Sequence, residues 1–256
     1  MATPEAKQEP TPRLELAGLS MSFGGLVVID NLDLVVNERE VVSVIGPNGA
    51  GKTTLFNLIT RLYRPDEGAI LFDDASLLRT PPHRVVRLGI ARTFQNVELF
   101  PTMTVVENVL IGARAGGRRF ELSRTTRKRA EETLALVDLD HYAHRPAAGL
   151  PFGTLKRVEL ARALASQPRL LLLDEPAGGL NHEEVEELGG FIRSLRDEFA
   201  LTVLLVEHHM NFVMNVSQTV HVLDFGRLIA SGTPAEVRAD PAVIEAYLGV
   251  EDDGAP

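Results

Sequence analysis

The sequence predicts an α/β fold in which strands and helices alternate around one open sheet. Three observations carry this prediction. The apolar run Val41–Ile45 leads directly into a glycine-rich segment, and a helix-like segment opens near Lys52. Two later apolar runs, Leu170–Leu173 and Leu201–Val206, have the length and composition of buried strands. Helix-like stretches separate these runs, and alternation of this kind is typical of α/β domains.

The other predicted elements follow in chain order. Met1–Pro12 is rich in proline and polar residues and lacks the charged start and apolar core of a signal peptide, so we expect a disordered leader. Apolar patterning predicts further strands near residues 13–19, 27–36 and 69–72, and helices that begin near residues 104, 126 and 155.

The helical stretch in the middle of the chain predicts an inserted subdomain. The late apolar strands should join the sheet of Val41–Ile45, so the residues between them have to project from that sheet. The predicted division is a leader at 1–12, a discontinuous α/β core at 13–94 and 156–249, an inserted helical subdomain at 95–155, and a tail at 250–256.

Composition excludes several classes of protein. No apolar run approaches 18 residues, so no spanning helix is expected, and the absence of cysteine is typical of cytoplasmic proteins. The net charge of −9 opposes sequence-independent attraction to nucleic acid or anionic lipid. The basic segment Arg114–Arg129 stands against that background. We favour the interpretation that this segment is a solvated helix face. The alternative is that it contacts lipid headgroups or nucleic acid.

One segment after the first buried strand has the spacing of a phosphate-binding loop. Its glycines allow backbone N–H groups to turn toward phosphate oxygens, and the positive end of the following helix points at the same charge. Lys52 adds a point charge and Thr53 a hydroxyl for magnesium. An ordinary glycine turn is the alternative. The segment matches G-x-x-x-x-G-K-[ST] at Gly46, Pro47, Asn48, Gly49, Ala50, Gly51, Lys52 and Thr53.

Polar residues follow the two late strands at the edge where ligands of open α/β sheets bind. Asp174 and Glu175 come directly after Leu170–Leu173. In a phosphate-loop fold Asp174 can hold magnesium through its water shell, and Glu175 can polarise the attacking water. His208 follows the next strand and could stabilise the γ-phosphate. An acidic turn and a neutral surface histidine are the respective alternatives.

The ordered set of motifs resembles the ATPase subunits of ATP-binding cassette transporters, over Leu14 to Gly249. Besides the segments above, the matching motifs are Phe23 before two glycines, Ala91–Gln95 and Pro176–Asn181. The branched-chain amino acid importer subgroup is the most similar, through residues 91–100, 206–208 and 232–249.

The resemblance implies the fold and the site residues. The fold is a P-loop NTPase (RecA-like) core with an antiparallel β subdomain and an inserted α-helical subdomain. The implied ligands are ATP and Mg²⁺. Phe23 would stack on adenine, Gly46 to Thr54 would hold the triphosphate, and Gly153 of a second subunit would complete the site. The implied magnesium groups are Thr53, Gln95 and Asp174, and the implied catalytic residues are Lys52, Glu175 and His208.

The signature segment departs from the common family pattern. The family usually has Leu-Ser-Gly-Gly-Gln where this chain has Leu150-Pro-Phe-Gly-Thr154, and three of those five positions differ. Pro151 suits a helix entrance, so Gly153 and the helix N-terminus can still face a γ-phosphate. A working site is favoured over one whose activity depends on a different partner chain. Asn181 and His209 also stand where relatives often carry acidic residues.

The resemblance also implies partners and location. A head-to-tail dimer, homologous or identical, would bind multi-span permease subunits on the inner face of the plasma membrane, with an external substrate-binding protein acting indirectly. The segment Gln95–Phe100 would receive a short permease helix. The alternatives are the ATPase of a lipid or lipopolysaccharide exporter and a soluble ATP-binding switch. A chromosome or DNA-repair ATPase is disfavoured because the helical insertion is too short for coiled-coil arms and the charge is acidic.

Overall fold

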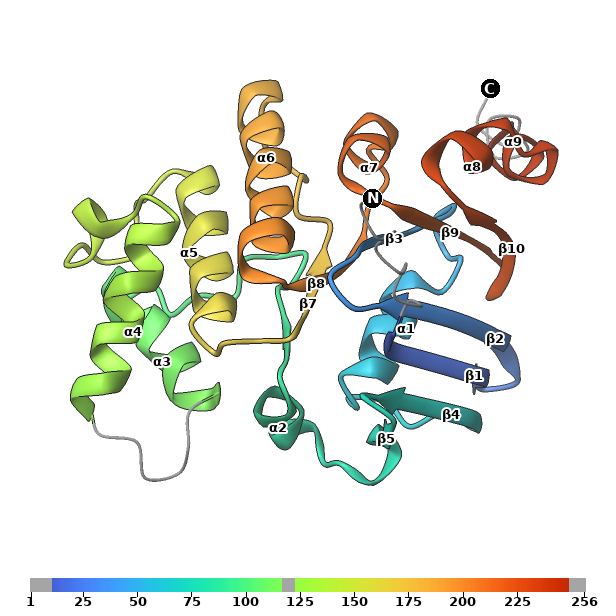
Figure 1. Cartoon of the computed structure of the whole chain (residues 1–256), viewed down its shortest axis with the longest axis horizontal. Coiled ribbons are helices and arrows are strands. Elements are labelled where there is room, and N and C mark those ends of the chain that lie inside the picture. The colour runs from blue at the N-terminus through green and yellow to red at the C-terminus, as the bar shows by residue number, and fades with distance from the viewer. Residues whose placement is uncertain (1–10, 117–122, 249–256) are drawn as a thin grey trace, which may run out of the picture.

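The computed structural model describes residues 11–116 and 123–248, which form two sheets with helices around them (Figure 1). The larger sheet has six strands in the order β10-β9-β3-β8-β7-β6, and its neighbours pair in parallel except β9 with β10. Its strands are β3 (Val41–Ile45), β6 (Ile90–Arg92), β7 (Leu170–Asp174), β8 (Thr202–Val206), β9 (Thr219–Asp224) and β10 (Arg227–Gly232).

The smaller sheet is antiparallel and has the order β2-β1-β4-β5. β1 and β2 form a long hairpin whose turn lies at Gly24 and Gly25, where positive φ angles of 56° and 88° suit glycine. The implied antiparallel β subdomain is therefore confirmed. Its strands are β1 (Pro12–Phe23), β2 (Leu26–Asn37), β4 (Glu67–Phe72) and β5 (Ala75–Ser76).

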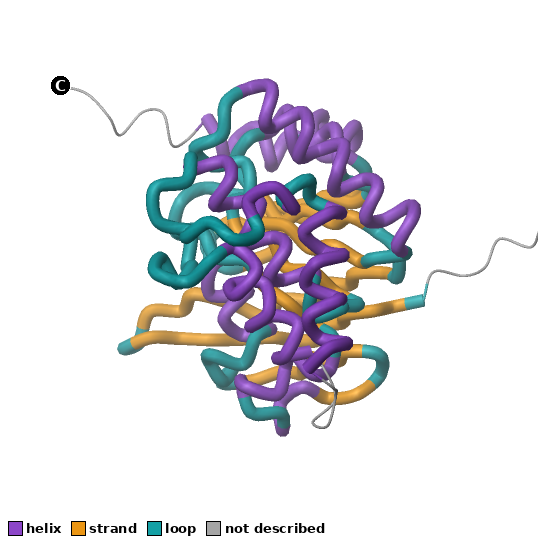
Figure 2. The backbone as a smooth tube through the Cα atoms, turned by 90° about the vertical axis from the view of Figure 1, so that its left-hand side faces the viewer, coloured by secondary structure: helices purple, strands orange, loops and turns teal. Residues whose placement is uncertain are grey.

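The helices lie on both sides of the large sheet and in a separate group beside it (Figures 1 and 2). Viewed from the side of that separate group, helices lie in front of the strands (Figure 2). The helical elements are α1 (Lys52–Ile59), η1 (Leu77–Arg79), α2 (Pro82–Val85), η2 (Val86–Leu88), α3 (Val105–Gly116), α4 (Ser123–Leu136), η3 (Asp140–Tyr142), α5 (Phe152–Leu164), α6 (His182–Phe199), α7 (Met210–Val216), α8 (Pro234–Ala239) and α9 (Pro241–Leu248).

The large sheet divides two apolar cores because successive strand residues point to opposite faces. Val42 of β3 belongs to the core that contains α1 and the small sheet, whereas Val41 belongs to the core under α6, α7 and α8. All five residues of β3, β7 and β8 are buried. Strands covered on both faces appear in a sequence as continuous apolar runs, which explains why these strands were predicted.

A third core joins α3, α4 and α5. Over the described residues this group is a compact cluster, and α4 shows a solvated basic face. Arg127 and Lys128 are exposed and pair with Glu131 and Glu132 one turn along. This agrees with the favoured interpretation of the basic segment 114–129, although residues 117–122 lie outside the described residues. In the described ranges, no helix combines the length and apolarity needed to cross a membrane.

Several element boundaries differ from those predicted. Pro12 begins β1 and is paired with Asn37, so the last residue of the predicted leader 1–12 belongs to a strand. Proline is acceptable there because it is the first residue of the strand. The predicted boundary between residues 155 and 156 falls inside α5, since Pro151 starts that helix earlier than apolar spacing suggested. The division into a core and an inserted subdomain otherwise stays a prediction.

Candidate nucleotide-binding and catalytic site

The phosphate-binding loop runs from the end of β3 to the start of α1. Gly46 has φ 150°, and a Cβ there would lie 2.0 Å from the carbonyl oxygen of Leu223. Gly51 has φ 99°, and its Cβ would lie 2.7 Å from the carbonyl oxygen of Val28. Only glycine fits at both positions. The loop can therefore pass this close to β9 and β2 and present its backbone to a ligand.

Lys52 fixes the curvature of this loop from inside. Its Nζ donates hydrogen bonds to the carbonyl oxygens of Gly46, at 2.6 Å, and Pro47, at 2.9 Å. Burial lowers the pKa of Lys52, and the nearby charges of Glu175 and Asp174 oppose that shift. The ammonium is thus held by two backbone carbonyls of the loop, which phosphate oxygens of a ligand can replace as acceptors.

The N-terminus of α1 presents donors and hydroxyls to the same space. Gly51 is its N-cap, with no side-chain cap and no acidic residue in the first turn. Its first N–H groups and the positive end of the helix dipole are therefore available to an anion. Thr53 is exposed and Thr54 half-buried on that first turn. A triphosphate fits this cradle on the donor geometry alone.

The second group of predicted residues meets beyond the ends of β7 and β8. Gln95 Nε2 donates a hydrogen bond to Glu175 Oε2 at 2.7 Å, and His208 Nδ1 lies 3.8 Å from the same oxygen. Glu175 has φ 46°, a left-handed conformation, and its N–H donates to the carbonyl oxygen of Val206 at 2.9 Å. This turn directs the carboxylate toward Gln95 and His208, so three residues from distant motifs share one site.

Asp174 is placed differently from its neighbour Glu175. It is 3 % exposed, and its Oδ2 pairs with Arg92 Nη2 at 2.7 Å. Arg92 ends β6, which lies beside β7 in the sheet. Sequence reasoning included Arg92 in a matching motif but assigned it no role.

Glu207 is a buried carboxylate at the same edge of the sheet, directly after β8. It is fully buried, and its two carboxylate oxygens accept N–H groups from Ala177, His208 and His209 at 2.8, 2.9 and 3.2 Å. A carboxylate that bridges two loops fixes their relative position. Glu207 therefore connects the loop after Glu175 to the strand end that carries His208.

Phe23 lies at the tip of the β1–β2 hairpin beside a second aromatic residue. Its ring meets Tyr63 edge to face, with centroids 5.3 Å apart and planes at 73°. Both side chains are partly exposed, at 42 % and 39 %. An exposed aromatic pair can offer a stacking face to a base. Tyr63 was missed because nothing local in the sequence places it opposite Phe23.

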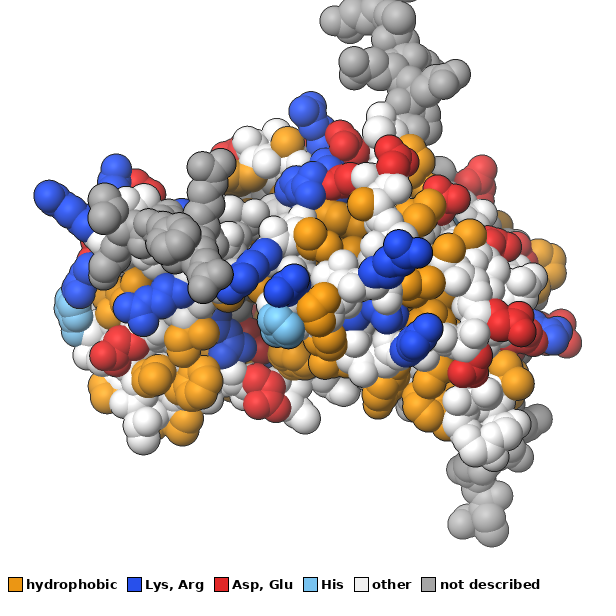
Figure 3. Space-filling view, turned by 90° about the horizontal axis from the view of Figure 1, so that it is seen from below, with side chains coloured by type: hydrophobic (Ala, Val, Ile, Leu, Met, Phe, Trp, Pro, Cys, Tyr) orange, Lys and Arg blue, Asp and Glu red, His pale blue; other side chains and the backbone are white. Residues whose placement is uncertain are grey.

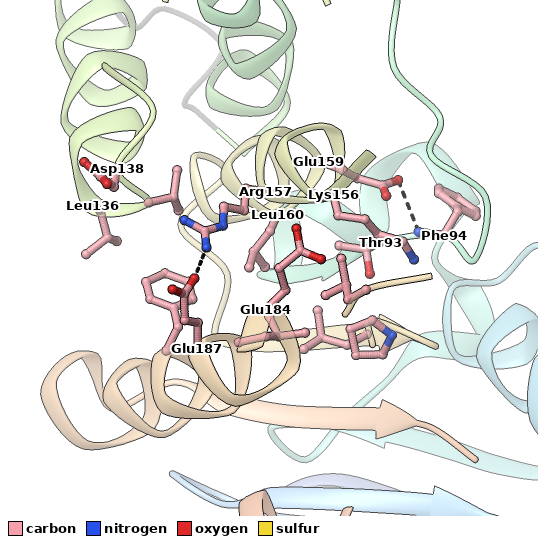
Figure 4. A pocket seen from close by; sticks show the side chains of 17 residues that line it. Thr93, Phe94, Leu136, Asp138, Lys156, Arg157, Glu159, Leu160, Glu184 and Glu187 are labelled. Carbon is pink, nitrogen blue, oxygen red and sulfur yellow. Dashed lines mark hydrogen bonds and ion pairs between the residues drawn. The ribbon is translucent and has the colours of Figure 1, made fainter. Parts of the chain in front are cut away.

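The signature segment begins α5 and packs against α6 (Figure 4). Pro151 is the N-cap, which agrees with the expectation that this proline suits a helix entrance, and Gly153 follows in the first turn. Lys156 Nζ donates to the carbonyl oxygens of Gln95, at 3.3 Å, and Glu175, at 3.2 Å. Figure 4 shows Lys156 and Glu159 of α5 along one pocket, which α6 and the loop of Thr93 and Phe94 also line. Lys156 thus joins α5 to the loop of Gln95 and to the loop of Glu175.

The fold and the site define a phosphate-loop ATPase. A family model described as ABC transporter matches residues 29–178, which include the phosphate loop and the Asp174–Glu175 pair. A second model, described as branched-chain amino acid ATP-binding cassette transporter, matches residues 227–253. The chain therefore belongs to the ABC transporter ATPases, the ATP-binding subunits that hydrolyse ATP to power transport.

Individual relatives agree with this assignment. The chain is 44 % identical over 250 residues to the high-affinity branched-chain amino acid transport ATP-binding protein BraF of Pseudomonas aeruginosa, covering 93 % of this chain and 98 % of that protein. It superimposes on the ADP conformation of MJ1267, an ATP-binding cassette of an ABC transporter, with TM-score 0.84, 30 % identity and coverage of 93 % and 99 %. The dimeric cassette MJ0796 bound to ADP and Pi gives TM-score 0.78, 28 % identity and coverage of 86 % and 98 %.

Proposed function

We propose that this chain is the ATP-hydrolysing subunit of an importer of branched-chain or related amino acids. The observation that carries the proposal is the match of residues 227–253, from β10 to beyond α9, to a family model of that transport class. The similarity to BraF along nearly the whole chain supports the same substrate class.

The site geometry supports a magnesium-dependent reaction. Thr53, Gln95 and Asp174 supply a hydroxyl, an amide oxygen and a carboxylate, and such oxygen ligands suit Mg²⁺. When bound, the ion would neutralise charge on the β- and γ-phosphates. These residues fit that role because Thr53 lies in the first turn of α1 beside the phosphate loop, Asp174 ends β7, and Gln95 follows β6 in the same sheet.

The chain's own groups would then divide the chemistry. Lys52 exchanges its two carbonyl partners for phosphate oxygens, and Phe23 stacks on the adenine ring. Glu175 orients a water molecule and accepts its proton. His208, whose Nδ1 lies 3.8 Å from Glu175 Oε2, donates a hydrogen bond to the γ-phosphate. The hydrogen bond from Gln95 to Glu175 would link the position of the proposed magnesium ligand to that of the water-orienting carboxylate.

The partners follow from the transporter class. We infer a dimer of two such chains, identical or homologous, in which Gly153 of one subunit faces the γ-phosphate bound by the other. Multi-span permease subunits would bind near Gln95–Phe100, and an external binding protein would deliver the amino acid. The chain would thus lie on the cytoplasmic face of the membrane.

One face of the molecule suits that location. Figure 3 shows Lys and Arg side chains gathered among apolar ones on the face seen from below, although the net charge of the chain is −9. The exposed arginines of η1, α2 and η2 belong to this part of the fold, and cationic groups attract anionic headgroups. They are Arg79, Arg84 and Arg87.

The test is a capture experiment followed by a transport measurement. Tagged Glu175→Gln protein is purified from detergent-solubilised membranes with ATP present, and bound proteins are identified by mass spectrometry. The matched control carries Lys52→Ala as well, which removes the phosphate-binding ammonium. We expect permease subunits with the first variant only, and loss of leucine uptake in cells that lack the gene.

Other outcomes would redirect the proposal. Capture of permeases together with unchanged leucine uptake and defective lipid export would replace amino acid import by lipid or lipopolysaccharide export. Capture of soluble proteins alone, together with negligible hydrolysis, would favour an ATP-binding switch.

A further inference from the structure

We propose that Arg92 is a positioning residue that holds the three predicted magnesium-binding groups, Thr53, Asp174 and Gln95, in register. The inference rests on the proposed magnesium-dependent function and assigns that site an additional residue.

Two short hydrogen bonds fix the guanidinium of Arg92. Nη2 donates to Asp174 Oδ2 at 2.7 Å, and Nη1 donates to Asn57 Oδ1 at 2.7 Å. The side chains of Arg92 and Asp174 are only 6 % and 4 % exposed. A buried carboxylate needs a partner of opposite charge, and Arg92 supplies it through Oδ2. Oδ1 is then the oxygen available to the water shell of the ion.

Asn57 carries this connection to the predicted hydroxyl ligand. It lies on α1 four residues after Thr53, and residues four apart share one face of a helix. Arg92 therefore bridges the face of α1 that carries Thr53 to the end of β7 that carries Asp174. The distance between these two ligands is set by one planar group with hydrogen bonds at both ends.

The guanidinium of Arg92 also contacts the loop that carries Gln95, the third predicted magnesium-binding residue. Its centre lies 4.9 Å from the ring of Phe94, the residue before Gln95, and 5.3 Å from the ring of Phe56 on α1. Arginine stacks on aromatic faces while its edges stay free for hydrogen bonds. One residue thus touches all three segments that supply the predicted magnesium ligands.

Lys52 does not replace Arg92 in this role. The ammonium of Lys52 donates to the carbonyl oxygens of Gly46 and Pro47, so the short ion pair of Asp174 is the one with Arg92. A lysine at position 92 would have one ammonium for two partners that now bond to separate nitrogens of the guanidinium. It would retain the charge and lose the bridge.

A purely structural ion pair between β6 and β7 makes a different prediction. It would change the folding stability and leave the effect of magnesium on nucleotide binding intact. A positioning residue changes the magnesium effect itself, because groups that orient metal ligands are typically worth about 10-fold to 100-fold in metal affinity.

The experiment compares nucleotide affinity with Mg²⁺ and with EDTA, using the full chain and fluorescently labelled ADP. We expect Arg92→Met to lose about 10-fold or more of the tightening that Mg²⁺ gives the wild type. Its affinity in EDTA should stay near that of the wild type. Arg92→Lys should be intermediate. The matched control is Arg87→Met, which removes an exposed arginine of the preceding turn and should change neither affinity.

A second variant keeps the proposal testable if Arg92→Met fails to fold. Asn57→Ala leaves the ion pair with Asp174 intact and breaks only the connection to α1, so it should still weaken the magnesium effect. Wild-type tightening by Mg²⁺ in folded Arg92→Met, or in Asn57→Ala when Arg92→Met does not fold, overturns the positioning role. Absence of any magnesium effect in the wild type itself would instead overturn the proposed magnesium site.

Discussion

Gln95 Nε2 donates a hydrogen bond to Glu175 Oε2 over 2.7 Å, across 80 positions of sequence. The bond joins the predicted magnesium ligand to the residue predicted to orient water. Lys156 reinforces the pair, since its ammonium donates to the backbone carbonyls of both residues. These hydrogen bonds connect α5 directly to the loop of Gln95 and to the backbone of Glu175, the residue predicted to orient water.

Glu175→Gln should retain ATP binding and lose turnover. A glutamine keeps the shape of the side chain and can still accept a hydrogen bond from Gln95, but it cannot accept a proton from water. We expect kcat to fall by about 100-fold or more, with nucleotide affinity within a few-fold of wild type. Steady-state ATP hydrolysis and equilibrium nucleotide binding are the measurements. Wild-type-like turnover would falsify the assignment.

The parts of the site that sequence predicted are those with a local signal. The phosphate loop, the Asp174–Glu175 pair and His208 all follow buried apolar strands, and strand ends of one open sheet necessarily meet at one edge. The order of the strands in the sheet was not needed for this conclusion.

The parts that sequence missed depend on pairing across the chain. Arg92 meets Asp174 across 82 positions because β6 pairs with β7, and Tyr63 meets Phe23 through the packing of two separate segments. Lys156 reaches its two carbonyls only because α5 lies over the sheet edge. None of these residues belongs to a pattern whose spacing specifies the partner.

Phe100→Asp should uncouple transport from ATP hydrolysis. The Phe100 side chain is 47 % exposed, while its backbone N–H and carbonyl are both bonded to the buried side chain of Asn108. A substitution therefore changes the surface and leaves the loop in place. Leu99 packs against the helical core, so Leu99→Asp would also destabilise the fold.

The measurement for Phe100→Asp pairs ATP hydrolysis by the free chain with amino acid uptake by the assembled transporter. Hydrolysis should be unchanged and uptake should be lost. Phe199→Asp, at an exposed phenylalanine that ends α6, is the matched control and should affect neither. Uptake that survives Phe100→Asp would exclude this segment as the permease contact.

His221 should make the fold less stable in mild acid. It is 5 % exposed on β9, with Nε2 3.3 Å from the carbonyl oxygen of Val35 and Nδ1 buried without a partner. Burial lowers the pKa of His221. The hydrogen bond to Val35 and the charge of Glu40 act in the opposite direction and do not cancel this shift. As pH falls below about 6.5, the unfolded chain binds a proton before the folded chain does, so the free energy of unfolding decreases.

Urea unfolding at pH 7.5 and pH 5.5 tests this sign. His221→Gln removes the titrating group, so the loss of stability between the two pH values should be smaller in this variant than in the wild type. His83→Gln, at an exposed histidine of α2, should leave the difference unchanged. An equal pH dependence in the wild type and in His221→Gln would contradict the assignment.

Gly153→Ala should separate two roles of the signature segment. A Cβ at Gly153 would lie 2.4 Å from Glu184 Oε1, so the Glu184 side chain has to move. That side chain closes the capping box of α6, accepting from the Asn181 N–H at 2.9 Å. Disturbing such a cap costs about 1 kcal/mol of stability. ATP hydrolysis should fall as well, because the added methyl group crowds the turn that is proposed to face the γ-phosphate bound by the other subunit.

The double variant Gly153→Ala/Glu184→Ala distinguishes the two effects. Glu184→Ala already lacks the side-chain half of the capping box that Gly153→Ala would disturb, while Asn181 can still cap the backbone N–H of residue 184. Adding Gly153→Ala to it should therefore cause little further loss in urea stability, which is the non-additivity expected of residues in contact. Hydrolysis should remain low in the double variant, since the methyl group at 153 is still present. Recovery of hydrolysis there would mean that Gly153 acts by leaving room for the α6 cap, and that the nucleotide does not meet this turn directly.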